Sequence, residues 1–530
     1  MTTTQARAHG NQDRSSRALW ERLLALVLCG GLIGAFVAVV LYASKSPTIA
    51  LLPVGLLIIC GATLFRDPRA YWFVLAVLSL QLKVGLNLND GRAVLDALKI
   101  DYTIENFTFQ IMATDLVFVM LGLLWLNDVL FHGKRLRFPS VGWLAVGYLA
   151  FCLLSSLKAP QPFLGFVELF QQAKFFIIFL YAVNCLEDKK FLRLLAILAV
   201  TILFTQGAVS LLRYKTGFVT PFTAGETGQD LSQVQEYLGV NRSDEDSGVR
   251  GFGTLGSPGS TVRLCMMLIP FALLLCFRNP LFKMRPLFMA LTGLGILGLG
   301  FTFDRVYYII TAFQGFLAIL TTHRNRLLGR GEGVAIVLIG LIAAAVLAPK
   351  LYEQFTVRKD SISVRLRQYE ASAKMIADKP LLGVGLNNGT AEKRKYSNVT
   401  YNKYDADTQF FLETTHNVYL NMASEIGVIG TACFFGFFLS VAWFAWRQSK
   451  IAGDAQVRWA SSAFVIVYVS VAVNCLMDPL QEYQAQLLLW LYAGLCLNLA
   501  RMARAENAQE TPSPLQIEQL QAADPRHSRS

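Results

Sequence analysis

Apolar runs of about 17–25 residues recur along this chain, and each is long enough to cross a hydrocarbon core of about 30 Å as a helix. Only helices and closed barrels satisfy every backbone polar group in lipid. The runs lack the alternation of apolar and polar residues that barrel strands show. Hydrophobic residues make up 54% of the 530 residues and charged residues 16%, so most of the chain can lie in lipid. The sequence therefore predicts an all-α polytopic membrane protein.

We expect about fourteen transmembrane helices from the pattern of apolar runs. They lie near residues 20–42, 48–65, 70–87, 111–130, 141–157, 164–184, 191–212, 261–277, 287–302, 305–320, 334–349, 418–446, 459–476 and 484–500. Three loops between them, at 87–110, 213–260 and 350–417, are long enough to carry structure or ligands. All three are predicted to face the same side, here called the outer side.

Lysine and arginine gather in alternate short loops, at 66–69, 132–137, 187–190, 278–285, 324–330 and 447–458. The short loops between these carry one basic residue or none. Because basic loops stay on the cytoplasmic side, both chain termini are predicted to be cytoplasmic. The net charge of +12 partly reflects this topology, so nucleic acid is not an expected partner.

These patterns divide the chain into seven parts. We expect a cytoplasmic N-terminal segment (1–19), an N-terminal transmembrane bundle (20–212), a first long outer loop (213–260), further transmembrane helices (261–349), a large and partly helical outer loop (350–417), C-terminal transmembrane helices (418–500) and a disordered cytoplasmic tail (501–530). The second long outer loop is predicted to hold the catalytic region.

Metal and nucleotide sites are not expected. All nine cysteines fall within apolar runs, which argues against a disulfide framework and against a cysteine metal site. Asp405 and Asp407 are expected to be solvated rather than to bind a divalent ion. The segment Gly251–Gly256 matches a glycine-rich nucleotide pattern, but it lacks the strand and helix that such a site needs. We expect that segment to pack close to a helix end, and we expect no metal and no cofactor.

His416 is the one histidine predicted on the outer side, because the other four lie in the tails or in cytoplasmic loops. The following residues Asn417, Asn421, Ser424 and Glu425 are spaced to share one helix face. A polar stripe on a membrane helix must face a cavity or the protein interior. His416 is therefore either a group that transfers protons to and from a substrate or a residue that caps its helix at the interface.

Four arginines lie on the predicted outer side, against the usual charge rule: Arg250, Arg263, Arg305 and Arg365. An arginine at membrane depth needs an anionic partner, and its planar fork suits the oxygens of a phosphate. The alternative is pairing within the protein, for which Asp304, Glu425 and Glu482 are the nearest candidates in the sequence.

Taken in order, four segments between about 250 and 430 resemble the superfamily of bacterial O-antigen ligases and O-antigen polymerases. They are Arg250-Gly251-Phe252-Gly253 with Ser257-Pro258, Asp304-Arg305, Arg365-Leu366-Arg367-Gln368-Tyr369 continuing to Pro380-Leu381-Leu382-Gly383-Val384-Gly385-Leu386, and His416-Asn417 with Tyr419-Leu420, Glu425, Gly427 and Gly430. The chain departs from the family pattern at Gly259, where Asn is usual, and at Asp304 and Val306 in a Ser-Arg-Gly turn.

The resemblance implies a membrane glycosyltransferase of the bacterial inner membrane. Members move a glycan from undecaprenyl diphosphate to an acceptor hydroxyl on the periplasmic side, without a nucleotide donor or a metal. A neutral His416 can accept the acceptor proton, and the guanidinium groups of Arg305 and Arg365 can stabilise the diphosphate leaving group. Direct displacement would invert the anomeric centre. The predicted substrate-binding residues are Arg250, Arg263, Asn417, Asn421 and Glu425.

The acceptor defines the subtype, and several remain open. A growing lipid-linked glycan would make the protein a polymerase, a lipid A-core sugar a ligase, and a protein hydroxyl an oligosaccharyltransferase. The number of predicted helices favours polymerisation of O-antigen or exopolysaccharide repeats, with membrane lipids and a chain-length regulator as further partners. A lipid-linked sugar transporter or flippase is the alternative of another class, although no internal repeat supports it.

Overall fold

The computed structural model describes residues 67–83, 85–87, 109–216, 251–276, 285–324, 360–397, 411, 414–480 and 482–510. Its α-helices are α3 (Pro68–Ser79), α5 (Ala113–Phe131), α6 (Gly142–Lys158), α7 (Pro162–Cys185), α8 (Lys189–Thr216), α11 (Pro258–Cys276), α12 (Arg285–Gly300), α13 (Arg305–Arg324), α15 (Asp360–Asp378), α16 (Gly389–Glu392), α18 (Val418–Ile451), α19 (Ala455–Asn474) and α20 (Tyr483–Glu510). A 3-10 helix, η2, covers Lys393–Tyr396, and two strands, β1 (Gly85–Asn87) and β2 (Gln110–Met112), complete the described elements.

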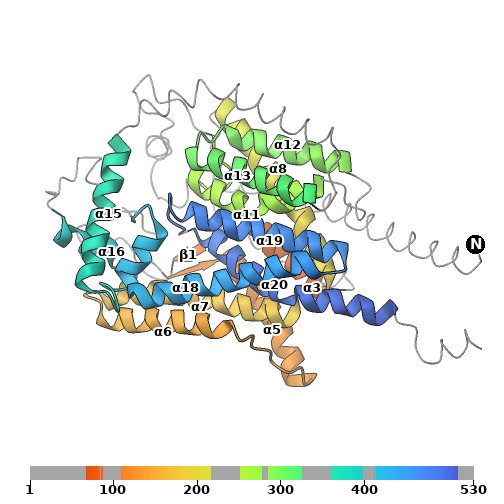
Figure 1. Cartoon of the computed structure of the whole chain (residues 1–530), viewed down its shortest axis with the longest axis horizontal. Coiled ribbons are helices and arrows are strands. Elements are labelled where there is room, and N and C mark those ends of the chain that lie inside the picture. The colour runs from red at the N-terminus through yellow and green to blue at the C-terminus, as the bar shows by residue number, and fades with distance from the viewer. Residues whose placement is uncertain are drawn as a thin grey trace, which may run out of the picture.

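Long apolar helices dominate the fold and run mostly side by side (Figure 1). By length and composition, seven described helices can cross a membrane: α5, α7, α8, α11, α18, α19 and α20. Helices α6 and α12 and the part of α13 at Arg305–Thr321 are apolar but shorter. The chain is thus a multi-pass membrane protein with a mainly α-helical fold. The predicted helices at 20–42, 48–65 and 334–349 lie outside the described residues, so the predicted total stays a prediction.

The helix predicted at 70–87 is wrong in its second half. Helix α3 begins where Asp67 accepts the backbone N–H of Ala70 at 3.1 Å and Pro68 occupies the first turn, but it ends at Ser79. Residues 85–87 instead form β1, which pairs antiparallel with β2 and places Gly85 opposite Met112. An apolar run alone does not distinguish a helix from a strand, and the strand pairing is a long-range contact.

The predicted disordered tail also begins too early. Helix α20 continues to Glu510, so residues 501–510 are helical rather than disordered. These residues are rich in alanine, arginine and glutamate, which favour helix, and they extend an apolar helix that is already formed. The boundary at 500 marked the end of the apolar run, which is not the end of the helix.

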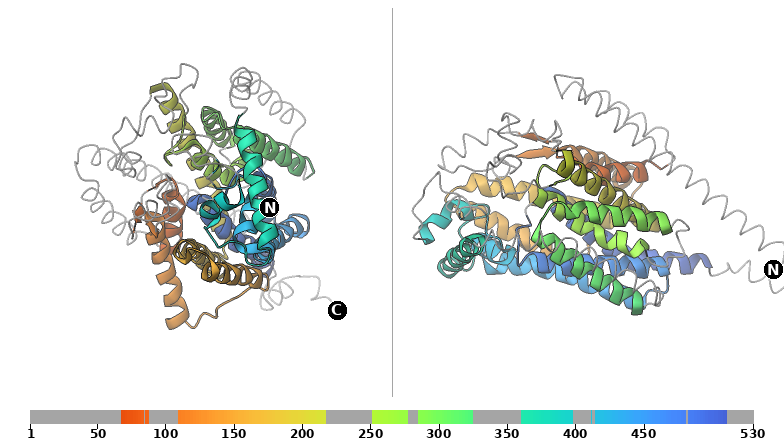
Figure 2. Two further views of the ribbon diagram at one scale, coloured as in Figure 1. Left: turned by 90° about the vertical axis from the view of Figure 1, so that its left-hand side faces the viewer. Right: turned by 90° about the horizontal axis from the view of Figure 1, so that it is seen from above.

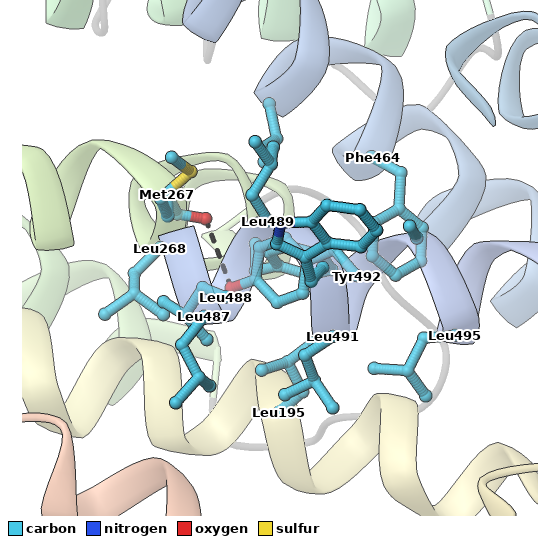
Figure 3. Close-up of a cluster of buried hydrophobic side chains, with 14 of the residues drawn as sticks. Leu195, Met267, Leu268, Phe464, Leu487, Leu488, Leu489, Leu491, Tyr492 and Leu495 are labelled. Atoms are coloured by element: carbon cyan, nitrogen blue, oxygen red, sulfur yellow. Dashed lines mark hydrogen bonds between the residues drawn. The ribbon is translucent and has the colours of Figure 1, made fainter. Parts of the chain in front are cut away.

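Helix α20 lies deep in the bundle, and α5 lies at its edge. In the apolar window of α20, 78% of residues are buried, against 22% in α5. The leucines between Leu487 and Leu495 lie with Leu195 of α8, Met267 of α11 and Phe464 of α19, and the Tyr492 hydroxyl donates to the Met267 carbonyl at 3.3 Å (Figure 3). A helix that is apolar all round belongs inside, whereas the exposed leucines of α5 suit a lipid-facing surface.

Helix α15 lies across one end of the bundle, where α18 and α20 begin and α19 ends (Figures 1 and 2). The segment after it, residues 379–397 with α16 and η2, folds onto the first turns of α18. Helix α15 and this segment belong to the stretch that we predicted as the second long outer loop. The helix ends and α15 together enclose the residues of the candidate site.

Candidate active site at the end of the bundle

One face of α15 holds the chain segment that carries His416. The Tyr369 hydroxyl donates to the backbone oxygen of His416 at 2.9 Å, and the hydroxyls of Ser372 and Thr415 are 2.9 Å apart. Gln368 accepts from the backbone N–H of His416 at 3.4 Å. Residues three and four apart share a helix face, so α15 contacts this segment along one stripe. His416 is only 8% exposed as a result.

Gln368 also sets which nitrogen of the His416 ring carries the proton. The Gln368 Nε2 group donates to the carbonyl of Phe411 at 3.3 Å, which leaves its Oε1 as an acceptor. Oε1 lies 3.3 Å from His416 Nδ1, so a neutral ring donates from Nδ1 and keeps its lone pair on Nε2. This tautomer follows from the hydrogen-bond network. In this tautomer the Nε2 atom is the ring nitrogen that can accept a proton.

The surroundings of His416 keep the imidazole neutral. Burial, followed by the positive charges of Arg365, Arg263 and Lys393, lowers the pKa of His416 to about 3. Burial likewise lowers the pKa of Lys393 to about 7. The Nε2 atom lies 4.0 Å from Asp478 Oδ1, which places a carboxylate beside the lone pair. At neutral pH His416 is therefore a proton acceptor rather than a cation.

Arg263 is neutralised by two carboxylates in the turn between α19 and α20. Its Nε and Nη2 atoms donate to Asp478 Oδ2 at 2.9 and 2.6 Å, and its Nη1 atom pairs with Glu482. The sequence analysis named pairing with Glu482 as the alternative to phosphate binding, and the structure shows that pairing. The sequence analysis missed Asp478. The available signal was that this acidic residue lies in a short outer turn that contains no basic residue. Gly259 sits against this guanidinium, where a Cβ would be 3.2 Å from Nη2.

Arg365 differs from Arg263 because the described residues give it no carboxylate partner. Its Nη1 atom donates to the carbonyl of Met477 at 3.3 Å, and its buried Nε atom has no hydrogen-bond partner within the described chain. Among the described residues, therefore, no carboxylate offsets the charge of Arg365. A guanidinium without such a partner is suited to an anionic ligand.

The other predicted site residues are distributed more widely. Arg250 lies outside the described residues. Arg305 is the first residue of α13, at the same end of the bundle, and its role stays a prediction. Asp304 accepts the backbone N–H of Tyr307 at 3.1 Å, so it caps α13 as a serine in that family position would. Asn417 caps α18 by accepting from Leu420 at 3.0 Å, so the capping role weighed for His416 belongs to its neighbour.

Glu425 joins two of the sequence segments that carry the family resemblance. Its carboxylate accepts the backbone N–H of Asn387 at 3.1 Å, and its backbone oxygen accepts from Gly385 at 3.0 Å. Helix α18 kinks at Gly427, whose φ of 78° is a left-handed conformation that favours glycine. A Cβ there would also collide with the backbone of Leu381. The turn at 380–386 and the kink in α18 are therefore two halves of one docking contact.

The glycine-rich segment Gly251–Gly256 is packed as the sequence analysis expected. Arg213, in α8, donates to the carbonyl of Gly253 at 2.5 Å, and Gln206 accepts the backbone N–H of Thr254 at 2.9 Å. The N–H of Gly251 donates to the carbonyl of Phe301 at 2.8 Å. Because these donors are already used within the protein, the segment is not a phosphate cradle.

The comparison with known proteins agrees with this placement of residues. Residues 252–435 match the sequence model of a protein family described as O-antigen ligase. The matched region includes α15, His416 and the kink of α18, whereas Asp478 and helices α6, α7 and α20 lie beyond it. No curated protein matches the chain. Over residues 252–435, this membrane protein is thus similar to the O-antigen ligase family.

Proposed function

We propose that this protein transfers a glycan from undecaprenyl diphosphate to an acceptor hydroxyl at the periplasmic face of the bacterial inner membrane. The observation that carries the proposal is a neutral His416, whose Nδ1 faces Gln368 Oε1, next to Arg365, which has no carboxylate partner among the described residues. One group suits removal of a proton and the other suits an anionic leaving group.

The proposed step is a single displacement. The acceptor O–H gives its proton to His416 Nε2 while its oxygen forms a bond to the anomeric carbon. The bond from that carbon to the diphosphate oxygen breaks, and the electron pair leaves with undecaprenyl diphosphate. Arg365 stabilises the charge on the leaving group, with Arg305 and Arg250 as further proposed contacts. Attack opposite the leaving group inverts the anomeric centre, and we propose that no metal takes part.

Donor binding would make His416 a stronger base. In the free protein, Arg365, Arg263 and Lys393 lower the pKa of the ring. A diphosphate bound among these cations offsets their charge and raises that pKa, so the ring gains basicity when the donor is in place. Asp478, 4.0 Å from Nε2, then stabilises the imidazolium that forms.

We propose a glycan polymerase as the subtype, with ligation to lipid A-core as the alternative. Both use the same displacement and differ only in the acceptor. Purified protein would be given a defined undecaprenyl-diphosphate glycan together with either a second lipid-linked glycan or a lipid A-core acceptor. Elongated lipid-linked glycan supports a polymerase, whereas a lipid A-core product supports a ligase. Binding of the donor without release of undecaprenyl diphosphate under either condition would favour a transporter instead.

The base assignment is tested by His416→Ala. Loss of a general base typically lowers the rate about 10²–10⁴-fold. His132→Ala is the matched control, because His132 is exposed just after α5 and lies outside the site. Transfer by His416→Ala at the wild-type rate would exclude His416 as the base.

A further inference from the structure

A cavity of about 90 Å³ lies beside the His416 segment. Thr414 and Val418, two residues before and two after His416, line it, as does Pro479, which directly follows Asp478. The rest of its wall comes from α6, α7, the 379–397 segment, α18, Leu480 and the start of α20. The parts from α6, α7 and α20 lie outside the region that matches the O-antigen ligase family.

Gln172, one of the residues that line the cavity, has a buried hydrogen-bond acceptor without a donor among the described residues. Gln172 of α7 is 3% exposed, and its Nε2 group donates to Glu168 Oε1 and to Gln486 Oε1, each at 2.7 Å. Both amide hydrogens are then used, while Gln172 Oε1 is buried with no partner among the described residues. An acceptor left in this state is costly, so a ligand that brings a donor gains by filling it.

Acceptor groups predominate elsewhere in the cavity as well. The carboxylates of Glu168 and Glu425 both line it, and no lysine or arginine is among its described lining residues. The rings of Tyr148 and Phe434, with centroids 4.9 Å apart, supply an apolar wall. An acceptor-rich cavity without a basic residue in its described lining does not suit a diphosphate, and it cannot hydrogen-bond a lipid tail. The hydroxyls of a sugar provide the missing donors, and the C–H face of its ring suits the aromatic wall.

The two sides of the proposed base therefore differ. Arg365, Arg263 and Lys393 act on His416 as positive charges, whereas no lysine or arginine is among the described residues that line the adjoining cavity. In a direct displacement the acceptor approaches from the side opposite the leaving group. The diphosphate belongs among the cations, which leaves the cavity for the acceptor.

We propose that this cavity binds the hydroxyl-bearing edge of the acceptor's terminal sugar, so that Glu168, Gln172 and Gln486 determine acceptor specificity. The inference rests on the proposed glycosyl transfer and adds the acceptor subsite to it. Its volume holds several water molecules, which suits one edge of a sugar ring rather than a whole oligosaccharide.

The test is steady-state transfer by Glu168→Gln and Gln172→Leu, with donor and acceptor varied separately. We expect the acceptor KM to rise about tenfold or more, because a lost hydrogen bond to a charged group is worth roughly that factor. The donor KM and the slow release of undecaprenyl diphosphate without acceptor should not change. Gln314→Leu is the control: Gln314 of α13 is also fully buried with an unpartnered Oε1, but it does not line the cavity.

The outcomes separate the two proposals. An unchanged acceptor KM in both variants, with transfer intact, overturns the acceptor subsite and leaves the proposed function standing. No transfer by the wild-type protein with any acceptor overturns the proposed function itself. If either variant does not elute from size-exclusion chromatography as a folded protein, Gln486→Leu replaces it. This variant changes the part of the cavity wall that α20 supplies, and we expect the same rise in acceptor KM.

Discussion

The cluster around His416 and the adjoining cavity are neighbours, but they are built in different ways. The His416 cluster draws on α11, α15 and the turn after α19, and it brings three cations to a neutral imidazole. The cavity draws on α6, α7, α18 and α20, and it collects carboxylates and amides. The first lies mostly within the family-matched region, whereas the second combines residues of that region with residues of α6, α7 and α20, which lie outside it. The two regions meet at the segment 414–418.

The largest expected difference between the two regions is in the effect of Arg365→Gln on kcat. Removal of the uncompensated guanidinium should lower kcat about 10²–10³-fold, as for loss of one donor to a developing negative charge, and should weaken donor binding. Because Arg365 is not part of the cavity, the acceptor KM should stay unchanged. Transfer assays with donor and acceptor varied separately measure both effects.

Arg367→Gln is the matched control for that variant, since Arg367 is exposed on the same helix. If Arg365→Gln raised the acceptor KM as strongly as it lowered kcat, the two regions would not be functionally separate.

Gly427→Ala should disturb both the His416 cluster and the cavity, because it should lower the stability of the folded protein. The kink in α18 requires a positive φ at this position, and an added Cβ would meet the backbone of Leu381. We expect the free energy of unfolding to fall by about 2 kcal/mol or more, because left-handed strain alone costs about 1–3 kcal/mol for a non-glycine residue. Thermal unfolding of the purified protein measures the change.

The control for the kink is Gly436→Ala in the same helix, where a Cβ would have ordinary contact with Leu144 at 3.8 Å. Equal thermal stability of the two alanine variants would show that the docking of 380–386 onto α18 does not hold the site together.

The smallest expected effect is a shift in pH dependence. In the free enzyme the pKa of His416 is lowered to about 3, so His416 should impose no acid limb on kcat/KM near its ordinary value of about 6.5. Arg365→Gln removes one of the cations that lower this pKa. The pKa should therefore rise, and the acid limb should move to higher pH.

Profiles of kcat/KM from about pH 4 to pH 8 follow this shift, with Arg367→Gln as the control. A wild-type acid limb near pH 6.5 that does not move in Arg365→Gln would contradict the electrostatic account of the His416 cluster.

Sequence reasoning found the residues of the His416 cluster that carry a local signal. His416 and Arg365 were identified because each sits in a motif and on a predicted side of the membrane, and the structure brings them together. Gln368 was part of a quoted motif, but its hydrogen bond to His416 Nδ1 joins residues 48 positions apart and could not be predicted from that motif. Asp478 was missed for the same reason, since its pairing with Arg263 spans 215 positions.

The cavity could not have been predicted to the same extent. Asn421 and Glu425 were expected to face a cavity, since a polar stripe on a membrane helix cannot face lipid. Glu168 and Gln172 lie more than 200 positions away on α7, an unusually polar span in which the sequence does not show what these side chains face. Only the packing of α7 against α20, through Gln172 and Gln486, shows that they line the same space.

The sequence by itself determined that this chain folds in a lipid bilayer. The length of an apolar run is a local property, and it decides whether a helix can span the hydrocarbon core. It also determined which unusual residues gather on one side of the bundle. The tertiary structure decided which of the arginines is neutralised, which nitrogen of His416 faces Gln368 and what lines the cavity beside it. Those properties depend on distances between side chains from different helices, and hydrogen bonds and charges act only over such short distances once the helices have packed.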